Sequence, residues 1–352
     1  MFRILTIGDP HFMISNLDDV EIFIKRFINL VEEKNPDIIV ILGDILHEHE
    51  RLHISPLNKA ISFIKTLSTY CPTYCLVGNH DMLNNKQFLT DNHWMNALKT
   101  HSSNIIIVDK VVSLDTLYGK FLFCPYVPPG QFQEAIDTYG NILEDNILTI
   151  FAHQEFYNCK MGAIISTEGD KWDINNPLVI SGHIHSNQRP QKNVYYPGAA
   201  LQHAFGESEK NIIAEIQYVN NNYEIIEHDL KLPRKEIKYV SLEELNKFTN
   251  IDTNNKTKLT IKCNYDDFKA FKKTQKYKEL SKYDNLKIIH KPEKIKIIQE
   301  NQNTREDIQL DNEGDFKKLL YDSLISEKNQ YLISDFNYLF LNKNKDEEIL
   351  II

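Results

Sequence analysis

The sequence predicts an α/β protein whose larger domain is followed by a small α+β unit and by carboxy-terminal helices. In the first 230 residues, apolar runs of strand length alternate with segments of helical periodicity, which is the pattern of a sheet with crossover helices. The run Ile38–Leu42 is entirely apolar, as expected for a strand buried on both faces. After residue 230 lysine becomes frequent and the order of elements changes, which indicates a second folding unit.

Helices in the first domain are predicted from apolar spacing. In Asp18–Glu33, the side chains of Val20, Phe23 and Phe27 fall on one face of a helix. The other predicted helices are Pro56–Leu67, Gln87–Lys99 and Gln131–Tyr139. The predicted strands are Phe2–Ile7, Ile38–Leu42, Thr73–Val77, Ile105–Val108, Lys110–Leu114, Gly119–Cys124, Ile147–Phe151, Leu178–Ile180, Asn211–Val219 and Tyr223–His228, with a further strand ending at Tyr195–Gly198.

The composition favours an intracellular protein. Residues 1–7 form a short apolar run that leads directly into Gly8-Asp9, so we expect a first strand there and no secretory signal. No apolar stretch approaches the roughly 18 residues of a membrane span. The 5 cysteines are odd in number and lie in apolar, strand-like contexts, which is typical of free thiols in a reducing compartment.

Charge is distributed unevenly along the chain. Residues 1–230 carry 16 Lys and Arg against 28 Asp and Glu, whereas residues 231–299 carry 18 against 9. Residues 300–352 are again acidic, with 6 against 12. A basic block between two acidic ones is typical of a domain that faces a polyanion. A lysine-rich surface that is merely solvated explains the charge equally well.

The chain is predicted to have three regions, namely 1–230, 231–299 and 300–352. The second region is a small α+β unit with a strand, a Lys-rich helix and another strand at Leu259–Cys263, Asp266–Ser281 and Leu286–His290. In the third region, a polar linker over residues 300–314 precedes helical spacing over residues 315–341. Those helices need a surface on which to bury their apolar face, either on this chain or on another.

Seven side chains of metal-ligand type follow the ends of predicted strands. In α/β sheets, ligands collect outside the carboxyl ends of the strands, so residues far apart in sequence are expected to meet in one pocket. Glycines precede several of them, as in Gly43-Asp44 and Gly78-Asn79, and suit sharp turns out of the sheet. The seven residues are Asp9, His11, Asp44, Asn79, His153, His183 and His185.

Oxygen and imidazole ligands without a thiolate suit two divalent ions, with manganese as the first candidate and zinc or iron as alternatives. Asp44 is expected to bridge the ions because a carboxylate has two oxygens. The expected ligand sets are Asp9, His11 and His185 for one ion and Asn79, His153 and His183 for the other. Two adjacent ions clamp the attacking and leaving oxygens of a phosphoryl displacement, so phosphoester hydrolysis is the predicted chemistry.

Three neighbouring residues are predicted to act in catalysis. His80 follows Asn79 and is expected either to donate a proton to the leaving oxygen or to stabilise charge on the phosphorus oxygens. Asp81 is expected to hold one nitrogen of His80 and raise its pKa, and His47 is expected to reach the phosphate. A single His-x-His or Asp-x-His is more often a surface or core feature. The metal site is therefore predicted from all the motifs together, in their order along the chain. The other histidines are predicted to be structural or surface residues: His49, His53, His93, His101, His203, His228 and His290.

The ordered motifs resemble the calcineurin-like metallophosphoesterase superfamily over roughly residues 1–215. They are Asp-x-His, Gly-Asp, Gly-Asn-His-Asp, His and Gly-x-His. The spacing is most similar to the SbcD-type nuclease subunits of DNA double-strand-break repair. His47 after Gly43-Asp44, the segment Tyr196-Pro197-Gly198 and the segment Phe205-Gly206-Glu207 carry this likeness, whereas Ala199-Ala200 departs from the family's serine-containing step. The resemblance implies a two-sheet α/β sandwich with a DNA-capping domain at residues 231–299.

The resemblance also implies partners. Members of that family bind an ATPase of the structural-maintenance-of-chromosomes (SMC) type through carboxy-terminal helices, and residues 315–341 are the matching position. The family forms homodimers through helices of the phosphoesterase domain, for which Pro56–Leu67 and Gln87–Lys99 are the candidates. DNA itself would contact the basic block at residues 231–299.

Three hypotheses about function follow. The first is a two-metal DNA nuclease, with exonuclease or endonuclease activity, in a repair or recombination complex with an SMC-type ATPase. The alternative is a metallophosphoesterase that acts on a small-molecule phosphodiester or a phosphoprotein, for which the basic domain would be dispensable. The third is a scaffold without catalysis, which the presence of every ligand type in the sequence disfavours.

Overall fold

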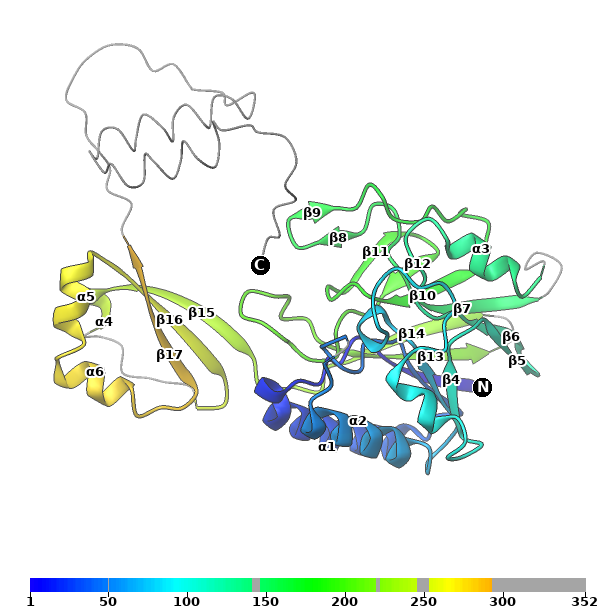
Figure 1. Cartoon of the computed structure of the whole chain (residues 1–352), viewed down its shortest axis with the longest axis horizontal. Coiled ribbons are helices and arrows are strands. Elements are labelled where there is room, and N and C mark those ends of the chain that lie inside the picture. The colour runs from blue at the N-terminus through cyan, green and yellow to red at the C-terminus, as the bar shows by residue number, and fades with distance from the viewer. Residues whose placement is uncertain (50, 141–145, 220–221, 246–252, 293–352) are drawn as a thin grey trace, which may run out of the picture. The chain divides into compact units, whose positions relative to one another are not determined.

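The computed structural model describes residues 1–49, 51–140, 146–219, 222–245 and 253–292 (Figure 1). The chain forms two units, Met1–Glu293 and Lys294–Ile352, and every described residue belongs to the first. The predicted linker and the predicted helices at residues 315–341 therefore lie outside the described residues. No helix in the described part of the chain is long and apolar enough to cross a membrane.

Two six-stranded sheets build the larger domain. The first has four neighbouring parallel strands and an antiparallel edge. In spatial order its strands are β14 (Asn222–His228), β13 (Ile213–Val219), β1 (Phe2–Ile7), β2 (Ile38–Ile41), β3 (Thr73–Leu76) and β4 (Ile105–Val108). The second has the order β11 (Gln188–Gln191), β12 (Val194–Tyr196), β10 (Leu178–Gly182), β7 (Ile147–His153), β6 (Gly119–Phe123) and β5 (Val112–Thr116).

The alternation of side chains along each strand produces the layers. Ile38 and Val40 of β2 belong to the core shared with Phe123 and Phe151 of the second sheet. Their neighbours, such as Ile39, point to the opposite face and pack under two helices, α1 (Leu17–Lys34) and α2 (Ile54–Leu67). The outer face of the second sheet packs against α3 (Phe132–Asp137). The predicted two-sheet α/β sandwich is confirmed.

Aromatic side chains join the two helices to the first sheet. Phe23 and Phe27 of α1 and Phe63 of α2 are fully buried, with the Phe63 ring centroid 5.8 Å from that of Phe23 and 6.2 Å from that of Phe27. These rings fill the layer between the helices and β1–β3, which holds the strand ends in place. The predicted helices Asp18–Glu33 and Pro56–Leu67 thus correspond to α1 and α2, which lie side by side in Figure 1.

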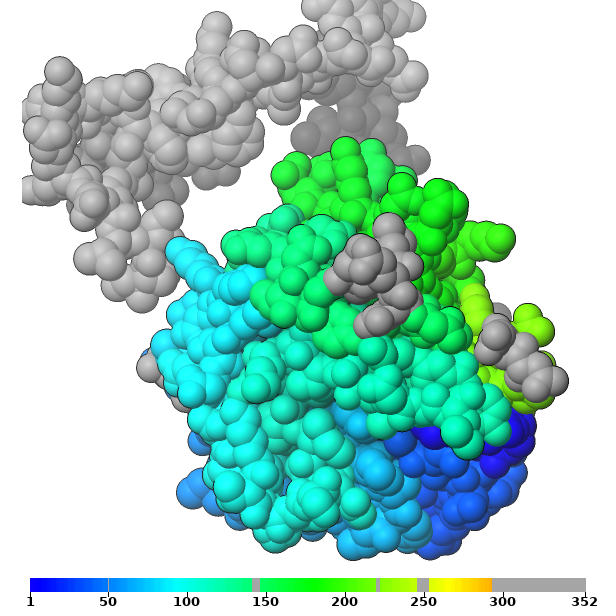
Figure 2. All heavy atoms as spheres, turned by 90° about the vertical axis from the view of Figure 1, so that its right-hand side faces the viewer, coloured from blue at the N-terminus to red at the C-terminus, as the bar shows by residue number. Residues whose placement is uncertain are grey.

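The predicted helix Gln87–Lys99 is wrong. Only a short 3-10 helix, Trp94–Leu98, forms there. Local polar contacts compete with the helix, because Asn92 N–H donates to Thr90 Oγ1 at 3.1 Å and Asn96 Nδ2 donates to the carbonyl of Asp91 at 2.9 Å. This part of the chain, coloured cyan, lies at the surface on the left of Figure 2.

A third, three-stranded sheet forms the smaller part. Its strands β15 (Lys235–Ser241), β16 (Lys256–Cys263) and β17 (Leu286–Pro292) are parallel, and its helices are α4 (Leu242–Leu245), α5 (Tyr265–Phe271) and α6 (Gln275–Leu280). The single helix predicted over Asp266–Ser281 is wrong. Thr274 caps α6 by accepting a hydrogen bond from the Tyr277 amide, and this cap starts a new helix after α5.

Candidate metal centre

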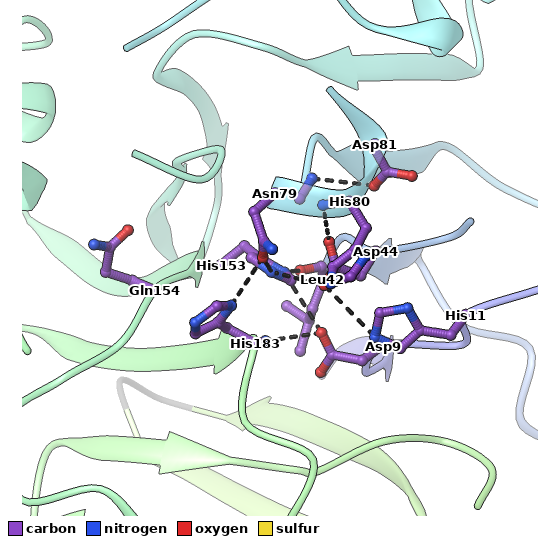
Figure 3. Close-up of polar contacts among 12 residues, drawn as sticks. Asp9, His11, Leu42, Asp44, Asn79, His80, Asp81, His153, Gln154 and His183 are labelled. Carbon is purple, nitrogen blue, oxygen red and sulfur yellow. Dashed lines mark hydrogen bonds and ion pairs between the residues drawn. The ribbon is translucent and has the colours of Figure 1, made fainter. Parts of the chain in front are cut away.

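The seven predicted ligands meet at one end of the two sheets, and Figure 3 labels all of them except His185. Each follows or ends a strand: Asp9 and His11 follow β1, Asp44 follows β2, Asn79 follows β3, His153 ends β7, and His183 and His185 follow β10. Sequence separations as large as the 174 residues between Asp9 and His183 are bridged by direct contact, since the His183 amide donates to Asp9 Oδ1 at 2.8 Å. The strand ends that carry the predicted ligands therefore lie close together, as the sequence predicts.

Several of these residues have unusual backbone conformations. Asp9, His11, Asp44 and His183 have φ angles of 37°, 41°, 51° and 78°. Residues other than glycine seldom adopt positive φ, and such conformations persist only where the surroundings enforce them. Backbone strain of this kind concentrates at functional sites, so its occurrence at four of the seven predicted ligands supports a functional centre.

Two glycines allow the ligands to approach one another. A Cβ atom on Gly78 would lie 2.3 Å from both the backbone nitrogen and Oδ1 of Asp44. A Cβ atom on Gly43 would lie 2.4 Å from His153 Nδ1, and the φ angle of Gly43 is +104°. Neither position has space for a side chain, which explains glycine before Asp44 and before Asn79.

One group of ligand atoms surrounds Asn79. Asn79 Oδ1 lies 3.0 Å from His153 Nε2 and 2.9 Å from His183 Nδ1. Ligands bound at about 2.0–2.1 Å to one ion lie roughly 3 Å apart, so these distances fit a shared ion. His153 Nδ1–H donates to the carbonyl of Leu42 at 2.7 Å, which fixes the tautomer and directs the Nε2 lone pair into the group, as expected for a metal-binding histidine.

A second group surrounds His11. His11 Nε2 lies 3.1 Å from His185 Nε2, again a separation that suits two ligands of one ion. Asp9 is fully buried and its Oδ2 has no hydrogen-bond partner among the described residues. A buried carboxylate oxygen without a partner is costly, and a cation at this point would satisfy it. The donor set therefore fits a divalent ion.

Asp44 joins the two groups. Its Oδ2 lies 3.4 Å from His153 Nε2 and 3.6 Å from His11 Nε2, while its Oδ1 accepts from the His80 amide at 2.8 Å. One carboxylate oxygen thus faces a histidine of each group. This is the place that the sequence predicts for a bridging ligand.

Burial and charge set the protonation of the histidines. Burial, reinforced by the charge of His153, lowers the pKa of His183 to about 3, and burial also holds the pKa of His11 well below its usual value. Both rings are therefore neutral and can bind a metal. Burial acts to lower the pKa of His153 too, but the charges of Asp44 and Asp9 outweigh it and raise that pKa to about 9. An ion at this place competes with the proton on His153.

His80 and His47 lie beside the ligands on the more exposed side. The Nδ1–H of His80 donates to the carbonyl of His47, and the two rings stack with centroids 5.5 Å apart. The ring of His49 also stacks with that of His80, with the two centroids 4.5 Å apart. Burial lowers the pKa of His80. His49, predicted to be a structural or surface residue, thus lies next to His80.

Asp81 has a different role from the predicted one. Its carboxylate accepts hydrogen bonds from the amides of Ile45 and Gly78, both at 3.1 Å, and from Trp94 Nε1 at 2.8 Å. Ile45 and Gly78 follow strands β2 and β3, whereas Trp94 begins the 3-10 helix Trp94–Leu98. No hydrogen bond or ion pair joins the Asp81 carboxylate to the His80 ring among the described residues. The prediction that Asp81 raises the pKa of His80 is wrong, because backbone donors occupy the carboxylate. Asp81 instead ties the loop of Asp44 to that of Asn79.

His203 lies at the centre, although its isolated position in the sequence gave no such signal. Its Nε2–H donates to the carbonyl of Asp9 at 2.8 Å, and its ring centroid lies 4.8 Å from that of His11 and 5.2 Å from that of His185. Nearby, Glu207 accepts from the amides of His203 and Ala204 at 2.8 and 2.9 Å. The sequence did not place His203 at the centre, because its position depends on a loop that the sequence pattern does not determine.

Comparison with known proteins agrees with this geometry. The model of the calcineurin-like phosphoesterase family matches residues 2–187, which include all seven predicted ligands. The chain belongs to the calcineurin-like phosphoesterase family. It is therefore a metallophosphoesterase, a hydrolase of phosphate esters whose family uses divalent metals, and the Asp and His side chains described above form a site that could hold them.

Relatives of this phosphoesterase occur in viruses of invertebrates. This chain is 48% identical over 285 residues to "Putative phosphoesterase 078R" of Invertebrate iridescent virus 3. The matched residues cover 79% of this chain and 81% of the relative. This chain is 49% identical over 281 residues to "Putative phosphoesterase 244L" of Invertebrate iridescent virus 6, covering 78% and 98%. The solved structure of YfcE, a phosphoesterase from E. coli, matches 64% of this chain and 97% of that chain with a TM-score of 0.33 and 12% identity.

Proposed function

We propose that this phosphoesterase is a two-metal DNA nuclease that hydrolyses phosphodiester bonds. The observation that carries the proposal is the position of Asp44 Oδ2, which lies 3.4 Å from His153 Nε2 and 3.6 Å from His11 Nε2. A carboxylate oxygen between two ligand groups suits a pair of adjacent ions. Bound divalent ions would supply Lewis acidity toward the phosphate and activation of water. Manganese is our first candidate, because the ligands are oxygen and imidazole.

His80 is assigned to the leaving oxygen. The backbone amide of His80 donates a hydrogen bond to Asp44 Oδ1, and its Nδ1–H donates to the carbonyl of His47. Nε2 is therefore the ring nitrogen that we assign to the substrate. Burial lowers the pKa of His80, but a phosphate anion at the centre favours the charged ring. The charged ring can then donate its Nε2–H to the leaving oxygen. His47 holds His80 in this orientation.

The charge of the second region supports DNA as the substrate. Residues 231–299 carry 18 Lys and Arg against 9 Asp and Glu, in a protein whose net charge is −9. Basic residues gathered on one part of an acidic protein favour contact with a polyanion. A small phosphate ester or a phosphoprotein would not require a separate basic sheet, which is why the nuclease is preferred to that alternative.

The proposal includes the expected partners. Residues 315–341 are the proposed binding segment for an SMC-type ATPase. A homodimer would use α2 (Ile54–Leu67), since the other candidate, Gln87–Lys99, is not a helix. A double-strand-break repair or recombination complex inside the cell is the setting that we propose for these contacts.

The test is hydrolysis of a labelled linear DNA duplex and of the matching single strand by the purified protein with Mn²⁺. Asp44→Asn serves as the control, because it removes a charge between the two ligand groups with little change in volume. Manganese-dependent degradation that disappears in Asp44→Asn supports the proposal. Hydrolysis of bis-p-nitrophenyl phosphate without cleavage of DNA would instead establish the small-ester alternative, and no hydrolysis of either would favour a scaffold.

The role of His80 has a separate test. His80→Ala should lose turnover by roughly 10²–10⁴-fold, the usual contribution of general acid–base catalysis, while its manganese content stays equal to that of the wild type. Metal content is measured by elemental analysis after dialysis. Loss of manganese together with turnover would show that His80 holds the metal and would contradict the assignment to the leaving oxygen.

A further inference from the structure

The three-stranded sheet has one face covered by its own helices and an opposite face on which Tyr239, Lys262, Lys287 and Lys291 are exposed. Leu259, Ile261 and Cys263 of β16 pack with residues of α5 and α6 in a core of their own. Because alternate residues of a strand point to opposite faces, the residues between them point the other way, and Figure 1 shows the helices on one side of the sheet. The strand register places Tyr239 beside Thr260, Lys258 beside Lys287, and Lys262 beside Lys291.

We call this surface the lysine face and define it by Tyr239, Lys258, Lys262, Lys287 and Lys291. Every residue of the three strands on that side is cationic, neutral polar or apolar, and none is acidic: Lys235, Ile237, Tyr239, Ser241, Lys256, Lys258, Thr260, Lys262, Lys287, Ile289 and Lys291. Such a surface is electrostatically complementary to a polyanion.

The lysines of this face are not neutralised by carboxylates within the described residues. At the amino-terminal ends of β16 and β15, Lys256 and Lys235 form ion pairs with Asp19 at 2.8 and 3.6 Å. No such pair involves the four lysines that define the lysine face, as far as the structure describes the chain. Lys262, Lys287 and Lys291 are also exposed to solvent, so their charges are available to a ligand.

An aromatic ring lies among these charges. Tyr239 is 53% exposed, which is unusual for an aromatic side chain on the middle of a strand. The ammonium groups of Lys262 and Lys291 lie 5.0 and 5.1 Å from its ring centroid. Aromatic rings bordered by cations are the binding surface that single-stranded nucleic acids use, since bases stack on the ring and phosphates contact the cations.

The lysine face leads to the metal centre through one loop. Lys258 Nζ lies 5.9 Å from the ring centroid of Phe205. Two residues further along, Glu207 Oε1 lies 3.6 Å from Nδ1 of the predicted ligand His185. The loop that borders the lysine face therefore also contacts the centre.

We propose that the lysine face binds single-stranded DNA, with one base stacked on Tyr239 and backbone phosphates on the lysines, and that it presents this strand to the metal centre. The inference rests on the proposed DNA nuclease and specifies the form of its substrate. A duplex hides the faces of its bases inside the helix, so it can use the lysines but not the ring.

The experiment measures binding of a fluorescent 20-nucleotide single strand and of the matching duplex by anisotropy, on the full chain in EDTA so that nothing is cut. Tyr239→Ala should weaken single-strand binding by roughly 5- to 150-fold, the value of one stacked base, and leave duplex binding within twofold. Tyr239→Phe keeps the ring and should bind as the wild type does. Tyr265→Ala is the matched control, because Tyr265 is 68% exposed on α5, on the other side of the sheet.

Salt dependence separates the lysines from the ring. Each phosphate contact to a single strand contributes a slope of about −0.7 to log K against log salt. Lys262→Ala should therefore reduce the slope by about 0.7, whereas Tyr239→Ala should lower affinity and leave the slope unchanged. Lys278→Ala, which removes an exposed lysine of α6, should change neither quantity.

Equal losses in Tyr239→Ala and Tyr265→Ala, or equal losses on single strand and duplex, would overturn the inference. RNA of the same sequence that binds tenfold more tightly than DNA would overturn the assignment to DNA. The proposed function fails separately, because binding in EDTA needs no turnover. Protein that binds as described but never cuts DNA contradicts the nuclease alone, and protein that cuts DNA while Tyr239→Ala binds normally contradicts the lysine face alone.

Discussion

A single methyl group on Gly78 should disable the metal centre without removing any ligand. The backbone of Gly78, with φ −84° and ψ 173°, is one that any residue can adopt, so the effect of alanine is steric. Its Cβ would lie 2.3 Å from Asp44 Oδ1, against the 3.4 Å at which ordinary contact begins. The carboxylate must withdraw by roughly 1 Å, and a displacement of that size can lower a rate by about 10²-fold.

The assay is kcat/KM for bis-p-nitrophenyl phosphate with Mn²⁺, together with thermal unfolding to show that the variant is folded. Gly78→Ala should lose about 10²-fold in kcat/KM. Gly130→Ala is the matched control. Nothing lies within 4 Å of the added Cβ, so no steric clash arises, and the φ of +85° means that the substitution introduces backbone strain alone. It should lose about 1–2 kcal/mol of stability and keep its activity. A Gly78→Ala enzyme within threefold of the wild type would refute the claim that the position of Asp44 matters.

Three further predictions concern the metal, a neighbour of the ligands and the core. Mn²⁺ added to EDTA-treated protein at 100 times its Kd should stabilise the fold by about 2.7 kcal/mol, seen as a rise in Tm that Asp44→Asn abolishes; an unchanged Tm would contradict the site. His203→Ala removes the hydrogen bond to the Asp9 carbonyl and should weaken Mn²⁺ binding by about 10- to 100-fold in isothermal calorimetry, whereas normal affinity would show that His203 is dispensable. Phe63→Ala should lower the free energy of unfolding by about 3–5 kcal/mol in urea titrations, because the ring is 1% exposed; a loss under 1 kcal/mol would mean that the layer repacks.

The ligands that directly follow a strand could be predicted from the sequence. Asp44 and Asn79 follow apolar runs that had to be buried strands, and parallel strands bring their carboxyl ends to one edge. The role of Asp81 was not predictable, because its partners Ile45, Gly78 and Trp94 come from three separate segments of the chain that only the folded sheet brings together. His203 was missed for the same reason, since its position depends on the loop after β12 (Val194–Tyr196).

The fold was predictable to a similar extent. Long amphipathic segments such as α1 were recognised from their periodicity, and the fully buried β2 from its composition. Gln87–Lys99 shows where periodicity fails. Its apolar residues have helical spacing, but Trp94 is drawn toward Asp81 by a 2.8 Å hydrogen bond and local polar contacts stop the helix. Hydrogen bonds of a few polar side chains thus prevent a helix that the spacing of the apolar residues would otherwise favour.

The ligands of each proposed ion come from both sheets. Asn79 belongs to the first sheet and His153 and His183 to the second, while Asp9 and His11 belong to the first and His185 to the second. Bound ions would therefore add cross-links between two layers that are already held together by apolar contacts and by hydrogen bonds such as that from His153 Nδ1–H to the carbonyl of Leu42. Separation of the sheets during unfolding would require the ions to leave first. Metal binding should therefore lower the unfolding rate constant and change the refolding rate constant much less. The metal-loaded enzyme should stay folded for longer than the metal-free enzyme.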